Sequence, residues 1–249
     1  MGYSWLRWST SHIGHRLTGS PNGTRAEATA DSLFRVGGSS LVSFAPFTAR
    51  AWSRGNVRTT ITNGNGTEEL LTSVALALTP DSSLLTGQLV DVGNGLPADV
   101  ERAGASLYGK VAVINLQLVA AQTGSSNLHR SEKTSLALDA GATGVVFINN
   151  VEGHILLTGT ASATGDVLKA PVVCIGQEEG AALREHMRVD SSLRVTIRMI
   201  NRNAQVTARN VICELPGSDP GAGVIVVGGH LDSWDLATGA TDNGLGSYS

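Results

Sequence analysis

The residues best suited to chemistry lie near the carboxyl end of the sequence, where two acids accompany one histidine. His230 and Asp232 are two residues apart, and Asp242 follows a glycine-containing loop and precedes an Asn-Gly turn. If the backbone is extended at His230, the side chains of His230 and Asp232 point the same way. Imidazole and carboxylate groups are normal zinc ligands, and one carboxylate can offer an oxygen to each of two metals. This combination therefore predicts a metal site.

A run of β-branched apolar residues, Val224–Val227, must position these side chains. Two glycines close the run, which predicts a strand buried on both faces and therefore central in a sheet. Ligands in open α/β sheets gather at the carboxyl ends of such strands. A simpler interpretation is that His230 and Asp232 only close a turn by hydrogen bonding, and for His-x-Asp alone it would be preferred. The glycines, the Ser-Trp-Asp that follows and the spaced Asp242 favour the metal site.

The phrases GGHLDSWD and GATDNG together resemble the metal-binding signature of the zinc exopeptidases that include bacterial aminopeptidases and carboxypeptidase Q. Within that family, the Ser-Trp-Asp after His-Leu-Asp resembles the sequence of the carboxypeptidase Q branch. The resemblance implies that His230 binds one zinc ion and that Asp242 bridges two. It assigns Asp232 to the catalytic machinery as the carboxylate that holds the His230 ring. It also implies that the reaction is hydrolysis of peptide bonds in short peptides.

A second motif, Arg-Leu-Thr-Gly-Ser-Pro-Asn, begins at Arg16 and resembles the start of the catalytic domain in the same family. Its glycine, Ser-Pro and Asn-Gly predict a loop over residues 18–23. A helix is expected to follow, with Thr24 as its N-cap, Glu27 completing a capping box and two glycines after Val36 ending it.

The middle of the chain predicts a separate α/β block. Its phrases Tyr-Gly-Lys-Val-Ala-Val-Ile, Asp-Ala-Gly-Ala-Thr-Gly-Val-Val and Lys-Ala-Pro-Val-Val resemble the protease-associated domain that carboxypeptidase Q carries inside its catalytic domain. Strands are expected around this block as well, with a turn at residues 63–66. The expected strands are 41–47, 56–62, 70–78, 110–115, 144–149, 170–175, 192–199 and 210–215, and the expected helices are 131–140 and 177–187.

The expected fold class is α/β: a zinc-exopeptidase-type mixed sheet flanked by helices, with an inserted protease-associated domain. Residues 1–86 are expected to begin the peptidase domain, residues 87–200 to form the inserted domain, and residues 201–249 to resume the peptidase domain. Only seven residues follow Asp242 in the chain. The resemblance places a Glu-Glu pair, an Asp and a final His further along, the first Glu being the general base. The expectation is therefore an amino-terminal portion of the enzyme, inactive by itself.

Composition excludes some functions and leaves others open. The net charge of −3 gives no case for nucleic acid, and no run of about 18 apolar residues predicts a membrane-spanning helix. The amino terminus lacks the continuous apolar core of a signal peptide. Cys174 and Cys213 lie in apolar, strand-like stretches and are expected to be buried free thiols, with a disulfide between them left open.

Two functions from different classes remain. The first is the zinc exopeptidase, for which the resemblance implies two zinc ions, a short peptide substrate, a secreted or extracytoplasmic location and a homodimer of the complete enzyme. The second is a non-catalytic module in which the protease-associated block binds protein or peptide and the metal motif is a remnant. The joint presence of His230, Asp232 and Asp242 favours an active ancestor.

Overall fold

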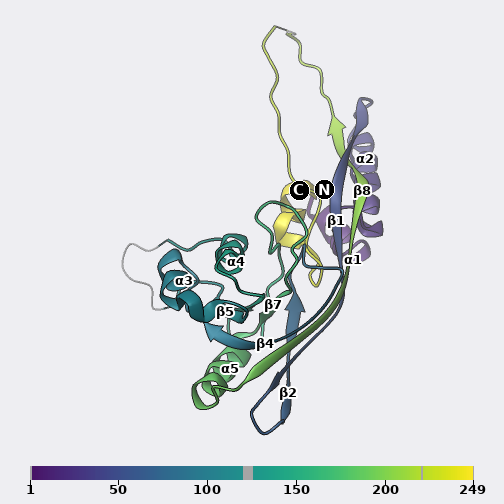
Figure 1. The fold of residues 1–249 in the computed structure, drawn as a ribbon. Helices are drawn as coiled ribbons and strands as arrows, with labels where there is room; N and C mark the ends of the chain where they lie inside the picture. Colours follow the sequence, from purple (N-terminus) through teal and green to yellow (C-terminus); the bar gives the residue numbers. More distant parts are fainter. Residues whose placement is uncertain (1, 120–125, 220, 249) are drawn as a thin grey trace. The chain divides into compact units, whose positions relative to one another are not determined.

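The structure is a computed structural model that describes residues 2–119, 126–219 and 221–248 (Figure 1). The chain divides into two compact units. The central unit comprises residues 54–203, and the terminal unit comprises residues 1–53 and 204–249. The domain boundaries expected from the sequence stay a prediction. No helix among the described residues is long and apolar enough to cross a membrane.

Eight strands of the described residues form one mixed sheet, in the order β2-β1-β8-β4-β5-β6-β7-β3. Strands β4 to β7 are parallel, whereas β2, β3 and β8 pair antiparallel with β1, β7 and β4. The expected α/β class with a mixed sheet is confirmed. The strands are β1 (Val42–Thr62), β2 (Glu68–Leu71), β3 (Ser73–Ala75), β4 (Ser82–Asp91), β5 (Val111–Asn115), β6 (Gly144–Ile148), β7 (Val172–Ile175) and β8 (Arg194–Cys213).

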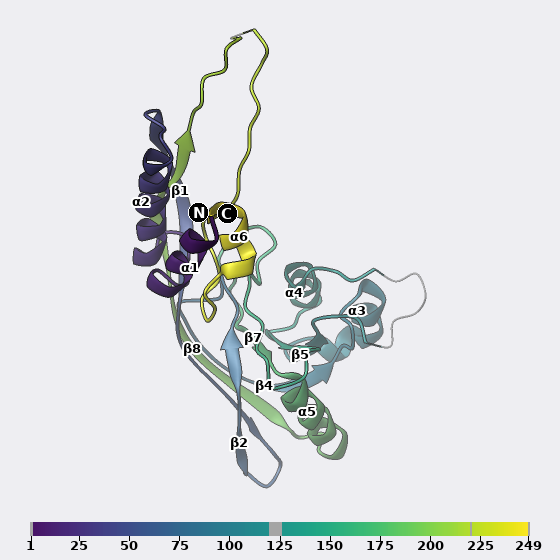
Figure 2. The same ribbon diagram turned by 180° about the vertical axis from the view of Figure 1, so that it is seen from behind.

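The core of the central unit surrounds β5, β6 and β7, in which every residue is buried. Side chains alternate across a strand, so Val145 and Phe147 face one side of the sheet and Val146 and Ile148 the other. The first side packs with residues of helices α3 (Pro97–Ala103) and α4 (Arg130–Asp139). Helix α5 (Gln177–Val189) packs over Ile148 on the second side, with Gly180 against that residue (Figures 1 and 2).

Strand β8 joins two strands that the sequence pattern separates. Its residues Val195, Ile197 and Met199 are fully buried, as the alternation predicts. Among the polar residues that follow, Asn201 donates from Nδ2 to Thr79 Oγ1 at 3.0 Å. This buried amide finds its partners in the segment between β3 and β4, and the extended backbone of β8 continues past it.

The terminal unit contains α1 (Gly2–His12), α2 (Pro21–Val36), the remaining parts of β1 and β8, an irregular turn Ala240–Gly244 and α6 (Leu245–Tyr248). Helix α2 begins four residues before the expected start. Ser20 is its N-cap and accepts from the Gly23 backbone N–H at 3.0 Å, while Pro21 occupies the first turn, where its missing N–H costs nothing. The Thr24 N-cap expectation was therefore wrong.

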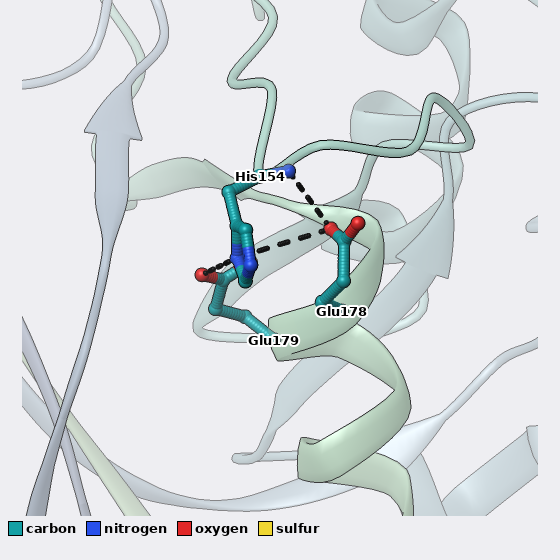
Figure 3. A group of neighbouring side chains, drawn as sticks. All are labelled: His154, Glu178 and Glu179. Atoms are coloured by element: carbon teal, nitrogen blue, oxygen red, sulfur yellow. Dashed lines mark hydrogen bonds and ion pairs between the residues drawn. The ribbon is translucent and has the colours of Figure 1, made fainter.

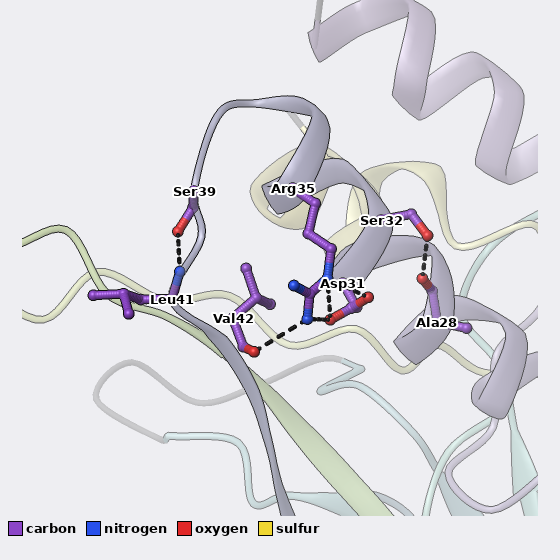
Figure 4. Close-up of polar contacts among 7 residues, drawn as sticks. All are labelled: Ala28, Asp31, Ser32, Arg35, Ser39, Leu41 and Val42. Carbon is purple, nitrogen blue, oxygen red and sulfur yellow. Dashed lines mark hydrogen bonds and ion pairs between the residues drawn. The ribbon is translucent and has the colours of Figure 1, made fainter.

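Glu27, expected in a capping box, instead links α2 to β8. Its carboxylate accepts from the Arg209 Nε at 2.7 Å and from the Arg209 backbone N–H at 3.1 Å. The end of α2 is fixed in a similar way (Figure 4). Arg35 pairs with Asp31 at 2.9 Å and donates to the backbone oxygen of Val42 at 3.2 Å, at the start of β1.

The segment Val224–Val227 does not form the expected central strand. Its four residues have no regular secondary structure and their exposed fractions are 87–92%. A buried strand needs neighbours on both edges and packing on both faces, and the described residues pair no strand with this segment. Of the two cysteines, Cys174 is buried in β7 and Cys213 is half-buried, and both are free thiols.

Candidate functional site

The structure brings together the three side chains that the sequence selected, all within the terminal unit. The His230 Nε2 lies 3.0 Å from Asp242 Oδ1, and the His230 Nδ1 lies 3.2 Å from Asp232 Oδ1. The imidazole thus stands between two carboxylates, one at each nitrogen. The exposed fractions of the side chains are 53% for His230, 55% for Asp232 and 81% for Asp242, so the group is open to solvent.

The hydrogen bonds of His230 define its tautomer. The Nδ1 also lies 3.0 Å from the backbone oxygen of Asp232, and a carbonyl oxygen can only accept. The Nδ1 therefore carries the proton and donates it to Asp232. A ring whose Nδ1 donates would bind a metal through Nε2, which is the atom that faces Asp242. This is the arrangement in which a carboxylate orients a metal-bound imidazole.

The donor set fits a zinc ion. Two ligand atoms that are each about 2.0–2.2 Å from one ion lie about 2.9–3.5 Å apart at ordinary coordination angles. The 3.0 Å between His230 Nε2 and Asp242 Oδ1 falls in this range. A zinc ion takes about four ligands, and these two residues supply two of them. The assignment of His230 and Asp242 as ligands stays a prediction.

Arg16 organises the loop that carries His230 and Asp232. Its side chain is fully buried and donates to four backbone oxygens, one of them within its own amino-terminal segment. The acceptors are Leu231 at 2.7 Å, Thr238 at 2.9 Å, Gly239 at 2.9 Å and Gly14 at 3.0 Å. Burial lowers the pKa of the Arg16 guanidinium from its usual value.

The backbone of Arg16 is part of the same arrangement. Its N–H donates to Ser233 Oγ at 3.0 Å, and its carbonyl accepts from the Ser233 N–H at 3.2 Å. The guanidinium also lies over the ring of Tyr248, 5.8 Å from the ring centre. Arg16 thus connects the amino-terminal motif to the loop after His230 and to the last helix, α6. These contacts bring the two motifs together within the terminal unit.

Gly239 closes the loop where no side chain fits. It has a φ of +64°, and a Cβ built there would lie 2.3 Å from the Cβ of Ser233 and 2.9 Å from Arg16 Nη2. Glycine alone tolerates both the backbone conformation and the close approach. The Gly239 carbonyl oxygen helps to hold the turn that follows, since it accepts from the Gly244 N–H at 2.9 Å. Asp242 lies within that turn.

Sequence reasoning found His230, Asp232 and Asp242 but assigned no role to Arg16. The available signal was the position of Arg16 at the head of the amino-terminal motif. Nothing in local periodicity shows that a surface-type residue is buried among carbonyl oxygens contributed by residues more than 200 positions away. The backbone of His230 is held as well, because Ser247 Oγ donates to the His230 carbonyl oxygen at 2.6 Å.

Two family models match this chain, one of a PA domain and one of a peptidase. Residues 85–183 match the family model of the PA domain. Residues 210–249, which include His230, Asp232 and Asp242, match the model of peptidase family M28. The resemblance to zinc exopeptidases with a protease-associated domain is thereby confirmed.

Individual proteins show the same likeness. Leucine aminopeptidase 2 from Arthroderma otae is 32% identical over 185 residues, which are 74% of this chain and 34% of that protein. Carboxypeptidase Q from Bos taurus is 24% identical over 250 residues, which are 99% of this chain and 52% of that protein. The structure of an aminopeptidase from Aneurinibacillus sp. strain AM-1 has a TM-score of 0.71 and 27% identity, over 99% of this chain and 56% of that one. The chain spans about a third to a half of the length of these relatives.

Proposed function

We propose that this chain carries part of the active centre of a zinc-dependent exopeptidase that removes terminal residues from short peptides. One observation carries the proposal: the His230 ring is held by Asp232 at Nδ1 and presents Nε2 to Asp242 at 3.0 Å. The match of residues 210–249 to peptidase family M28 supports the same chemistry. Two zinc ions, an extracytoplasmic location and a homodimer stay predictions.

Asp232, Asp242 and Arg16 have different roles at the proposed site. Asp232 keeps the proton of His230 on Nδ1, so that Nε2 is free to act as a ligand. Asp242 is exposed and can place one oxygen beside Nε2 while its second oxygen remains available. A zinc ion at such a site supplies a Lewis acid for the peptide carbonyl and makes an attacking water more acidic. Arg16 acts through the backbone of residues 231–239 and is a positioning residue.

The test is hydrolysis of an unblocked dipeptide by the full gene product, with and without a chelator. We expect chelator-sensitive turnover, with kcat/KM reduced at least about 100-fold by His230→Ala or Asp242→Asn, because each removes a ligand. Asp232→Asn should cost about 10- to 100-fold, because it loosens a ligand without removing it. Asp219→Asn is the matched control, since the Asp219 carboxylate accepts from the backbone N–H of Gly221 in an exposed turn and its loss should leave the rate unchanged.

Blocked substrates identify which end of the peptide is recognised. An aminopeptidase requires the free amino group and should fail on an N-acetylated dipeptide, whereas a carboxypeptidase requires the free carboxylate and should fail on a dipeptide amide. Turnover that resists chelation, or that survives His230→Ala unchanged, would contradict the proposal. Specific peptide binding without any turnover would instead support the non-catalytic module.

Residues 1–249 prepared alone should hydrolyse the dipeptide at the background rate. His230 and Asp242 supply two ligands where zinc takes about four, so the ion is held weakly. Among the described residues, the one group of three or more potential ligands within 4.8 Å of one another does not include His230. Chelator-sensitive turnover by this polypeptide would show that other residues complete the site.

A further inference from the structure

A second group of metal-ligating side chains lies in the central unit. His154 belongs to the segment between β6 and β7, and Glu178 and Glu179 belong to the first turn of α5 (Figure 3). One ligand atom from each of the three side chains lies within 4.8 Å of the other two. No other group of three or more His, Cys, Asp or Glu in the described part of the chain meets this criterion.

The distances suit one small ion. The His154 Nδ1 lies 2.8 Å from Glu179 Oε1 and 3.9 Å from Glu178 Oε2. Ligand atoms at about 2.0–2.2 Å from a zinc ion are about 2.9–3.5 Å apart, so the distance from each carboxylate oxygen to the His154 Nδ1 needs to change by only a few tenths of an ångström. Figure 3 shows that the two carboxylates approach the imidazole from the same helical turn.

The two carboxylates are already held in place. Glu178 accepts from the backbone N–H of Gly153 at 2.6 Å and from that of His154 at 3.0 Å, so it fixes the loop that carries the histidine. Glu179 has an exposed side-chain fraction of only 16%, and its Oε2 is buried without a hydrogen-bond partner. A buried carboxylate oxygen with no partner is costly, and a bound cation would offset that cost.

The charges of the group favour a cation in spite of its place at a helix end. The amino terminus of α5 carries a partial positive charge that opposes a cation. The two carboxylates outweigh it, and the backbone hydrogen bond from Gly153 helps to hold the pKa of Glu178 below its usual value. His154 has an exposed side-chain fraction of 66%, which leaves room for water to fill the remaining coordination positions.

We propose that His154, Glu178 and Glu179 bind one divalent transition-metal ion, for which one nitrogen and two oxygen ligands suit zinc. The His154 Nδ1 now shares its proton with Glu179, so binding releases that proton to solvent and replaces it with the ion. The ion would tie the loop between β6 and β7 to α5. The site is independent of the function proposed for His230, because all three residues lie in the central unit.

The experiment measures zinc bound by the full gene product after equilibrium dialysis at neutral pH. His154→Asn and Glu179→Gln should each weaken binding of one equivalent at least tenfold, or about 1.4 kcal/mol. Asparagine is chosen because His154 has a φ of +57°, and asparagine visits this left-handed region more readily than most residues. Circular dichroism confirms that both variants are folded.

His186→Asn is the matched control. His186 is also a histidine of the central unit, and it pairs with a single carboxylate, Glu69, at 3.3 Å. Its replacement should leave zinc binding unchanged, and His230→Ala should affect only a different equivalent. Zinc should also raise the melting temperature of the natural protein more than that of His154→Asn. Equal zinc binding by the natural protein, His154→Asn and Glu179→Gln would overturn the proposal.

Discussion

Replacement of Arg16 by methionine is expected to release the loop that carries His230 while the central unit stays folded. Methionine fills much of the same volume but donates no hydrogen bonds. Four backbone oxygens, those of Gly14, Leu231, Thr238 and Gly239, would lose their donor. Hydrogen bonds from a charged donor contribute about 1.5–3 kcal/mol each, so we expect a local destabilisation of about 3 kcal/mol or more.

Amide hydrogen exchange measures this effect directly. The backbone N–H of Ser233 donates to the Arg16 carbonyl and that of Gly244 to the Gly239 carbonyl, and both should exchange at least about 100-fold faster in Arg16→Met. Arg16→Lys should be nearly as damaging, because an ammonium cannot reproduce the planar fork of the guanidinium.

The control for Arg16→Met is Arg35→Met, which removes an arginine of the same unit. Arg35 is half-exposed and pairs with Asp31 within α2, so its loss should change stability by less than about 1 kcal/mol. Unchanged exchange at Ser233 and Gly244 in Arg16→Met would show that the loop does not depend on this residue.

The second large effect concerns pH and the buried Lys133. This residue of α4 is fully buried, and its Nζ donates to the backbone oxygens of Asn115 at 2.8 Å and Leu116 at 3.2 Å, at the end of β5. Burial lowers the pKa of Lys133 from 10.5 to about 8. The charged form is therefore disfavoured in the folded protein, although both hydrogen bonds survive deprotonation.

The free energy of unfolding should respond to pH in a defined direction. Between pH 8 and 10.5 the unfolded chain keeps the Lys133 proton and the folded protein loses it, so the unfolded state binds more protons. The contribution of Lys133 to the free energy of unfolding therefore increases as pH rises from 8 to 10.5, and it decreases again as pH falls back to 8. The shift corresponds to about 3 kcal/mol at about 1.4 kcal/mol per pH unit.

Chemical denaturation of the natural protein and of Lys133→Met, at a series of pH values, isolates the effect. The difference between their unfolding free energies should increase by about 3 kcal/mol from pH 8 to 10.5. Subtraction is needed because burial raises the pKa of the Cys174 thiol to about 11, which acts in the opposite direction above pH 9. A difference that does not change with pH would mean that Lys133 keeps its ordinary pKa.

Much of the central unit could be predicted because its strands are short and buried on both faces. Runs such as Val111–Asn115 and Gly144–Ile148 are apolar at every position or nearly so, and only a strand inside a layered sheet can bury them. Helix α5 was found within two residues of its observed end because its pattern is local. The same holds for the alternation along the first half of β8.

The candidate site was predicted in part, because residue types and spacing carry its chemistry. His230, Asp232 and Asp242 were selected from the signature, and the structure brings them together. The burial of Arg16 was not predicted, since its partners are far away in the sequence and are backbone oxygens. Every residue has a backbone oxygen, so such a partner cannot be recognised from the amino-acid type. The pairing of His154 with Glu178 and Glu179 was also missed, because the histidine and the two glutamates are far apart in the sequence.

The sequence by itself determined which segments are apolar enough to form strands and which residues can bind metal. Tertiary structure alone decided where those segments lie. Val224–Val227 has the composition of a central strand, yet it is exposed, because a strand forms only where neighbouring backbone supplies its hydrogen bonds. In contrast, an arginine became buried because four carbonyl oxygens converge on it. The pattern of apolar residues shows which side chains a segment could bury. Whether they are buried depends on the packing and hydrogen-bonding partners that other segments supply.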